Sequence, residues 1–175
     1  MRRQILDRAL RLFAEHGFKG TSLHDIAVEA RCSKASLLYH FAGKDAILAE
    51  LLTPPAESLT ALSGELAVLD GDRAVEPAVT GFIGLALRFH LEVKIIFAEL
   101  PDMLNHPVLA VIPQAVDQLA DALAGRSQEP RARVRAQMVI GGVAVTVASD
   151  VEVEPDTMRT ELVQGALRTL GRPTS

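Results

Sequence analysis

Apolar residues recur at helical spacing along nearly the whole chain, and this periodicity limits the possible folds more than any other feature. Between residues 2 and 17 they follow the i, i+3, i+4, i+7 rule of one helix face: Ile5, Leu6, Ala9, Leu12 and Phe13. Leucine and alanine are abundant and β-branched runs are short, which favours helices over strands. Only VAVTV (143–147) could be read as a strand, and the glycine and alanine at its start favour a packed helix. The sequence therefore predicts an all-α fold.

Cap residues predict where the first three helices begin and end. Gly17 ends the first helix. Ser22 caps the second, and Asp25, three residues later, completes a capping box. Ser33 caps a short third helix that runs to about Phe41. The result is three short helices within the first 41 residues.

The rest of the chain also reads as helices. Lys44 or Asp45 opens a fourth helix, which Pro54 and Pro55 are expected to stop or kink. The further helices expected are one over about 56–69, two or three within 75–124, and a closing pair at 131–149 and 156–171. The predicted architecture is a small head joined to a larger helical body.

Composition favours a folded cytosolic protein. Hydrophobic residues make up 49% of the 175, too many for a largely disordered chain. The longest apolar run (138–148) is about half of a membrane span, and charged residues interrupt the apolar stretch near the start, so no secretion signal is expected. Cys32 stands alone, which excludes an internal disulfide. We expect it to be a small core residue of a turn, with a redox sensor as the alternative.

The third helix has an apolar side and a polar side. Leu37 and Phe41 form its core stripe, and Ala35, Ser36, Tyr39 and His40 gather opposite them. Small residues at the N-terminal end permit close approach to a surface, and the free backbone N–H groups there favour an anion. This pattern suits a helix that enters the DNA major groove. The alternative is a three-helix unit whose polar side faces only water.

Spacing and charge agree with a helix-turn-helix. The second helix, a break of about four residues and the short third helix have the required order, with the first helix bracing both. Residues 1–50 hold 8 Lys and Arg against 6 Asp and Glu, whereas residues 51–175 hold 10 against 16. The front end is thus positive by 2 and the rest negative by 6, which hints at a polyanion partner, although an ordinary charge fluctuation would give the same difference.

Two segments carry a resemblance to a known family: ALRLFAEHGFKGTSLHDIA (9–27) and SKASLLYHFAGKDAIL (33–48). Over about residues 3–50 the chain resembles the tetracycline-repressor (TetR) family of bacterial transcription regulators. Beyond residue 50, the resemblance covers only the helical pattern and the length. It implies a helix-turn-helix DNA-binding domain at 1–46 and a ligand-binding and dimerisation domain at 47–175.

The resemblance also implies a set of DNA contacts. Phosphates would be held mainly by Thr21, Tyr39, His40 and Lys44, and base edges would face Lys34, Ala35 and Ser36. The full set expected at DNA is Thr21, Ser22, Ser33, Lys34, Ala35, Ser36, Tyr39, His40 and Lys44.

Two residues depart from the usual family pattern. Arg31 stands where the turn commonly has glycine, and it either adds a phosphate contact or is simply solvated. Leu38 stands where a tyrosine usually contacts the DNA backbone, so one hydroxyl donor is lost, although a leucine can touch a sugar or a thymine methyl. Tyr39 is then the only phenol left.

In such a family the body often binds a small effector. The candidate ligand-binding residues here are Phe82, Leu85, Phe89, His90, Phe97, Met103 and His106. Aromatic and methionine side chains around a few polar groups suit a small hydrophobic ligand, although core packing explains each residue equally well. His90, Glu99, Asp102 and His106 suggest a metal site only weakly, because Pro101 and Pro107 break the helical register; no metal or cofactor is expected.

The last two predicted helices carry small and apolar residues that suit a symmetric four-helix interface. The residues expected there are Val139, Gly142, Val145, Thr146, Leu162, Ala166 and Leu170. The alternative is that this apolar stretch packs only within its own chain.

Taken together, we expect a cytoplasmic, ligand-responsive homodimeric repressor that binds a near-palindromic operator. The alternative is a DNA-binding regulator without an effector that acts through protein partners. An all-α enzyme is disfavoured, because the sequence has no His-Glu-x-x-His, Gly-x-Ser-x-Gly, phosphate-binding glycine loop or paired-cysteine motif. The operator, the regulated genes and the effector cannot be read from the sequence.

Overall fold

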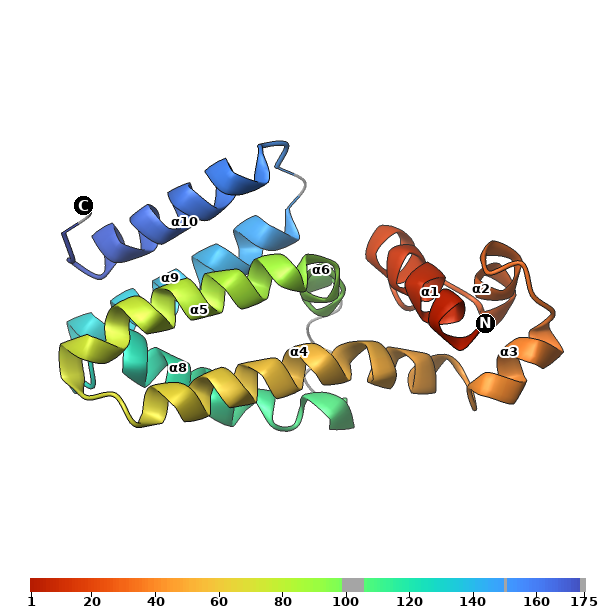
Figure 1. The fold of residues 1–175 in the computed structure, drawn as a ribbon, viewed down its shortest axis with the longest axis horizontal. Coiled ribbons are helices and arrows are strands. Elements are labelled where there is room, and N and C mark those ends of the chain that lie inside the picture. The colour runs from red at the N-terminus through yellow and green to blue at the C-terminus, as the bar shows by residue number, and fades with distance from the viewer. Residues whose placement is uncertain (99–105, 150, 174–175) are drawn as a thin grey trace.

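The computed structural model describes residues 1–98, 106–149 and 151–173, and these ranges contain nine α-helices, two short 3-10 helices and no strand. The predicted all-α fold is thus confirmed for the described chain. The α-helices are α1 (Arg2–His16), α2 (Leu23–Glu29), α3 (Lys34–His40), α4 (Lys44–Ala67), α5 (Val75–Arg88), α6 (His90–Ala98), α8 (Ile112–Leu123), α9 (Pro130–Ala148) and α10 (Pro155–Thr169), with 3-10 helices η1 (Gly71–Ala74) and η2 (Pro107–Leu109). Figure 1 shows α1–α3 as a head at one end and α5, α8, α9 and α10 as a body at the other.

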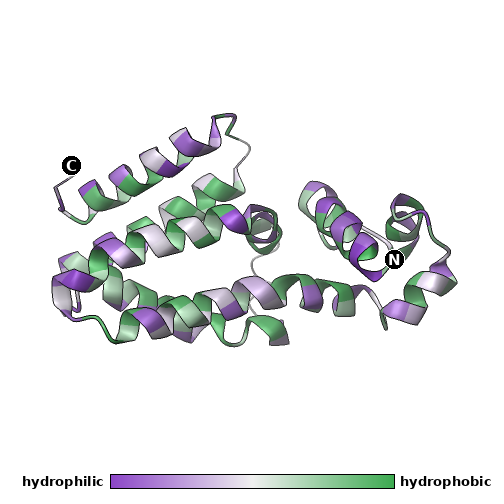
Figure 2. Cartoon of the chain, viewed as in Figure 1, coloured by the Kyte–Doolittle hydropathy of each residue, from purple (hydrophilic) through white to green (hydrophobic). Residues whose placement is uncertain are grey.

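The head forms around the side chains that helical periodicity places on one side of each helix. Helix α1 has hydrophilic residues along one side and hydrophobic residues along the other (Figure 2). Its Ile5, Ala9 and Phe13 are buried, as are Ile26 of α2 and Leu37 of α3. Three of the five stripe residues predicted for α1 are thus buried, and the other two, Leu6 and Leu12, are half-buried against the same core.

The connection between α1 and α2 depends on two glycines. Gly17 has a φ of 77°, in the left-handed region that favours glycine, and it ends α1 as predicted. A Cβ atom at Gly20 would lie 2.2 Å from the carbonyl oxygen of His16, so only glycine fits there. The two glycines let the chain reverse and enter α2.

Helix α4 is one continuous helix of 24 residues, so Pro54 and Pro55 do not stop it, and the separate helix expected over about 56–69 is wrong. These prolines have no N–H to donate to the carbonyls of Glu50 and Leu51, and two helical hydrogen bonds are lost. The helix continues because both sides of the prolines are anchored by buried side chains. On the N-terminal side of the prolines, the core of the head includes Ile47, Leu48, Leu51 and Leu52. On the C-terminal side, Leu59 belongs to the core of the body.

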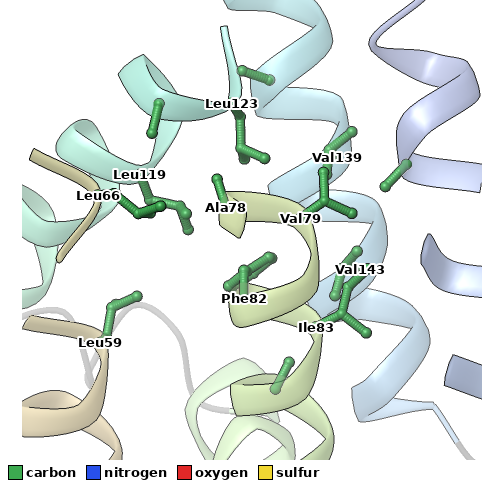
Figure 3. Close-up of a cluster of buried hydrophobic side chains, with 14 of the residues drawn as sticks. Leu59, Leu66, Ala78, Val79, Phe82, Ile83, Leu119, Leu123, Val139 and Val143 are labelled. Atoms are coloured by element: carbon green, nitrogen blue, oxygen red, sulfur yellow. The ribbon is translucent and has the colours of Figure 1, made fainter. Parts of the chain in front are cut away.

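The body packs around α5. Phe82 and Ile83 of α5 lie between Leu59 and Leu66 of α4 on one side and Val143 of α9 on the other (Figure 3). Helix α10 is the outermost helix, resting on α5 and α9 (Figure 1). The predicted closing pair of helices is confirmed as α9 and α10.

Head and body share packing at one junction. Ile95 of α6 and Leu109 of η2 are buried in the same cluster as the head residues, and α6 packs against both α1 and α9. Within the described ranges, no helix is both long enough and apolar enough to cross a membrane.

Candidate nucleic-acid interface

The turn between α2 and α3 is closed by backbone hydrogen bonds at the end of α2. The N–H of Cys32 donates to the carbonyl of Ala27 (2.9 Å), and that of Arg31 donates to Val28 (3.0 Å), which together form a Schellman motif. Arg31 occupies the left-handed position of this motif, with a φ of 52°. A glycine would adopt this conformation without strain, so the departure noted in the sequence has a conformational cost.

Each helix of the pair begins at a serine cap, as predicted. The backbone N–H of Ser36 donates to the Ser33 hydroxyl (3.0 Å), and that of Asp25 donates to the Ser22 hydroxyl (3.2 Å). The Ser22 hydroxyl and N–H in turn donate to the Asp25 carboxylate, which holds the pKa of Asp25 below its ordinary value. Both serines are exposed, and both belong to the set of residues predicted to contact DNA.

Helix α3 packs on the head through one side and presents the other to solvent. Leu37 is fully buried and Phe41, its C-cap, is nearly so. On the opposite side Tyr39 is 86% exposed, and Lys34 and Ala35 are exposed as well. Five of the nine residues predicted to contact DNA are thus exposed: Ser22, Ser33, Lys34, Ala35 and Tyr39.

The remaining predicted residues of α3 are less open. Ser36 and His40 are half-buried, and the His40 ring lies edge-on to the Tyr39 ring, with centroids 5.3 Å apart. Leu38, which the predicted contact set omits, is 45% exposed. The sequence shows that Leu38 replaces the tyrosine usual in the family, but only the packed structure shows that this leucine is exposed.

The predicted phosphate contact of the Thr21 side chain is wrong. Thr21 is 2% exposed, and its hydroxyl donates to the carbonyls of Gly17 (2.9 Å) and Leu12 (3.2 Å). The side chain closes the α1–α2 connection from inside, because a buried hydroxyl must find an acceptor within the protein.

Lys44 also has an internal role. Its ammonium donates to the carbonyls of Phe18 (2.6 Å) and Thr21 (2.8 Å) and lies 4.4 Å from the centroid of the Phe18 ring. These contacts tie the start of α4 to the α1–α2 connection. The predicted phosphate contact stays a prediction, and two of the three ammonium N–H groups are already engaged.

Arginines of α1 brace the head. Arg2 forms an ion pair with Glu50 of α4, and its guanidinium lies 4.7 Å from the centroid of the Phe41 ring. Arg8 pairs with Glu29 of α2 at 3.1 Å. These contacts link α1 to α2, to α4 and, through the Phe41 ring, to the end of α3.

The predicted ligand-binding residues that the structure describes differ in their burial. Phe82 and Phe89 are buried, Leu85 and Phe97 are half-buried, and Met103 lies outside the described residues. His106 is half-buried, and its Nδ1 accepts from the backbone N–H of Val108. A cavity of about 620 Å³ instead lies between α5 and α10, over Val75, Val163 and Leu167.

One predicted ligand residue does line a cavity. His90 borders a space of about 550 Å³ between α5 and the connection from α9 to α10, together with Leu87, Met158 and Arg159. No group of three metal-binding side chains occurs within the described ranges, which leave out Glu99 and Asp102.

The predicted dimer residues fall into two groups. Val139 and Ala166 are buried in the core of their own chain, so neither presents an exposed side chain to a second copy. Thr146, Leu162 and Leu170 are half-buried, whereas Gly142 and Val145 are exposed. Periodicity could not separate the α9 residues of these groups, because residues 138–148 of this helix are apolar on nearly every side.

An exposed apolar stripe on α9 includes two residues that the sequence reasoning missed. Val134, Met138 and Val145 are 59%, 61% and 53% exposed, and Gly141 lies between them. At about 100° per residue, these four positions fall within about 60° of one another and opposite the buried Ala136, Val139 and Val143. The buried positions 136, 139, 143 and 147 also follow helical spacing, so the sequence pattern alone does not show which side of α9 stays exposed.

Comparisons with known proteins agree with this geometry. Residues 5–51 match the model of bacterial regulatory proteins of the tetR family. Over 47 residues the chain is 49% identical to the biofilm operon icaADBC HTH-type negative transcriptional regulator IcaR of Staphylococcus aureus strain Newman. The Staphylococcus epidermidis protein of that name is 45% identical. These matches cover 27% of this chain and about a quarter (25%) of the relatives' length.

Solved structures resemble the whole chain. The ketosteroid transcriptional regulator KstR2 of Mycobacterium tuberculosis superposes with a TM-score of 0.79 at 21% identity, over 97% of this chain and 93% of that one. AmtR of Mycobacterium smegmatis gives a TM-score of 0.75 at 27% identity, over 100% of this chain and 88% of that one. The likeness therefore extends beyond the head to the body.

Proposed function

We propose that the chain is a sequence-specific, DNA-binding transcriptional regulator of the TetR type that acts in the cytoplasm, because residues 5–51 match the tetR family model and AmtR superposes over the whole chain at 27% identity. The observation that carries the proposal is α3. This helix buries Leu37 in the head and leaves Lys34, Ala35 and Tyr39 open to solvent. A short helix that is anchored through one side can enter the major groove with its other side, while polar and charged side chains near it hold the DNA phosphates.

Repression is the proposed direction of regulation. The matched relatives are named as negative regulators, and the match covers their residues equivalent to the head of this chain. Occupation of an operator by the protein would then exclude transcription from the neighbouring promoter. A reporter placed behind the selected operator should fall in output when this chain is expressed.

The exposed stripe of α9 supports a homodimer. A two-fold axis through a stripe of Val134, Met138, Gly141 and Val145 would bury these residues against their own copies, with the glycine permitting close approach. Two α3 helices about one DNA turn apart, roughly 34 Å, would then read the halves of a near-palindrome. Met138→Glu should convert the dimer to a monomer in sedimentation analysis and lower DNA affinity.

Gln137→Glu is the matched control for that variant, because Gln137 is the exposed neighbour of Met138 and lies about 100° around the helix from it, outside the stripe. It adds the same charge and should leave the dimer intact. A dimer that persists in Met138→Glu would overturn this interface.

An effector is proposed to act through α4, which connects the two cores. A small molecule in the α5–α10 cavity would have to bind better to the state in which the heads are spaced wrongly for DNA. The second candidate, a regulator without an effector, is favoured by the burial of Phe82 and Phe89 in packed cores. Compounds that release the protein from its operator distinguish the two.

The deciding experiment is selection of random duplex DNA by the purified protein at low and moderate salt. A near-palindrome should be enriched, and the logarithm of affinity should fall linearly with the logarithm of salt concentration, because phosphate contacts release counterions. Tyr39→Ala should weaken binding to the selected sequence, whereas Glu65→Gln, on the exposed side of α4, should not. Failure to enrich any sequence at low salt would refute the proposal.

A further inference from the structure

An apolar side chain lies within the outward surface of α3. Leu38 is 45% exposed, although its neighbour Leu37 is fully buried. At about 100° per residue, Leu38 lies about 60° from Ala35 and about 100° from Tyr39 around the helix. Ala35, Leu38 and Tyr39 are spaced i, i+3, i+4 and form what we call the outer patch of α3.

The outer patch has the shape of an apolar reading surface. Ala35 carries a single methyl group, so it leaves room for a base edge to approach Leu38. The polar side chains of the helix flank the patch: Lys34 lies on the Leu38 side and Ser36 on the far side. Leu38 itself can neither neutralise a phosphate nor exchange a hydrogen bond with a base.

Only one base edge in the major groove offers a methyl group. Thymine presents its C5 methyl there, and an apolar side chain gains by excluding water from it. We propose that Leu38 is a specificity-determining residue that selects thymine, in each half of the operator, by packing against this methyl group. The inference rests on the proposed function, since it concerns how the same helix chooses its sequence.

A contact with the sugar is the competing role for Leu38. It would bury the same side chain but would be blind to the base, so replacing thymine would cost nothing. The two roles therefore differ in one measurable quantity, the dependence of affinity on a single methyl group.

The test replaces each thymine of the selected operator by deoxyuridine, which removes the methyl group and leaves the pairing edge unchanged. We expect one such thymine in each half-site. Replacing it in one half-site should weaken binding of the wild-type protein about 4-fold, and replacing it in both should weaken binding about 15-fold. These values follow from the usual free energy of burying one methyl group. Leu38→Ala should bind the thymine operator more weakly and lose this sensitivity at that position.

Val28→Ala provides the matched control, because Val28 is an exposed aliphatic residue of the same head and lies on α2 outside the predicted contacts. It should keep the full sensitivity to deoxyuridine. Thermal unfolding of each variant confirms that the head remains folded. A selected operator without any methyl-sensitive thymine, or a sensitivity that persists in Leu38→Ala, would overturn the inference. Absence of any selected operator would instead refute the proposed function.

Discussion

Replacing Arg31 by glycine is expected to stabilise the protein. Arg31 has a φ of 52°, in the left-handed region, which costs an ordinary residue about 1–2 kcal/mol. Glycine removes this cost but loses about 0.5–1 kcal/mol through the greater freedom of its unfolded chain. The Arg31 side chain is exposed and makes no hydrogen bond or ion pair with described residues, so little else is lost. The net gain is therefore about 0.5–1 kcal/mol.

Thermal unfolding measures this gain. For a chain of this length, 1 kcal/mol shifts Tm by about 2–4 °C, so Arg31→Gly should raise Tm by about 1–4 °C. A lower Tm would refute the reasoning, because it would mean that the arginine side chain contributes more than its backbone conformation costs. Arg31→Lys keeps the charge and the strained backbone, and it should leave Tm nearly unchanged.

Arg126 supplies the contrasting control, since its φ of 60° lies in the same region. Its guanidinium donates to the carbonyl of Leu66 (2.6 Å) near the end of α4 and to the carboxylate of Asp121 (2.6 Å). Hydrogen bonds from a charged group contribute about 1.5–3 kcal/mol, more than the strain costs. Arg126→Gly should thus lower Tm, although the same substitution at Arg31 raises it.

The Arg31→Gly variant also decides between the two roles left open for this side chain. If the guanidinium holds a phosphate, its loss should reduce the salt dependence of DNA binding by about 0.9 in log–log slope for each protomer. We expect this reduction, because the motif places Arg31 between α2 and α3. An unchanged slope with a raised Tm would leave Arg31 as a solvated residue.

Three further predictions concern α4 and α6. Burial raises the pKa of Glu92. This carboxyl therefore favours the folded state below its ordinary pKa of 4.5, and the contribution is lost as pH rises through the raised value. Glu92→Gln should raise Tm at pH 7.5 more than at pH 4, and an equal shift at both pH values would contradict this. Lys44→Met removes two hydrogen bonds to backbone carbonyls and should lower the free energy of unfolding by about 2 kcal/mol in urea titrations. If stability is unchanged and DNA affinity depends less steeply on salt, Lys44 instead holds a phosphate. Pro54→Ala restores an N–H donor to Glu50 at an exposed position and should stabilise the protein by about 1–2 kcal/mol in the same titrations, and a loss of stability would show that the helix depends on the proline.

Local chemistry in the sequence was enough to predict the head. The caps at Ser22 and Ser33, the glycine at the end of α1 and the spacing of buried residues are decided within a few positions of one another. The order and spacing of the second and third helices followed from the same signals. A pattern of this kind survives folding because each cap satisfies backbone groups of its own helix.

Other assignments required contacts between distant segments. Thr21 and Lys44 carry polar groups that suit DNA, yet one hydroxyl turns inward to Leu12 and the ammonium turns to Phe18, because the α1–α2 connection brings carbonyls to them. A residue type fixes which bonds a side chain can make, and the fold decides which acceptor is nearest.

The sequence by itself determined the all-helical architecture, the helix-turn-helix and most of the surface that α3 presents. Only the tertiary structure decided that α4 continues through Pro54 and which side of α9 remains open. A helix that is apolar all round has no periodic signal to distinguish its buried side, so neighbouring helices make the choice. Packing of α5 and α10 against Val139 left Met138 exposed, and that exposure now marks the surface where a second copy is proposed to bind.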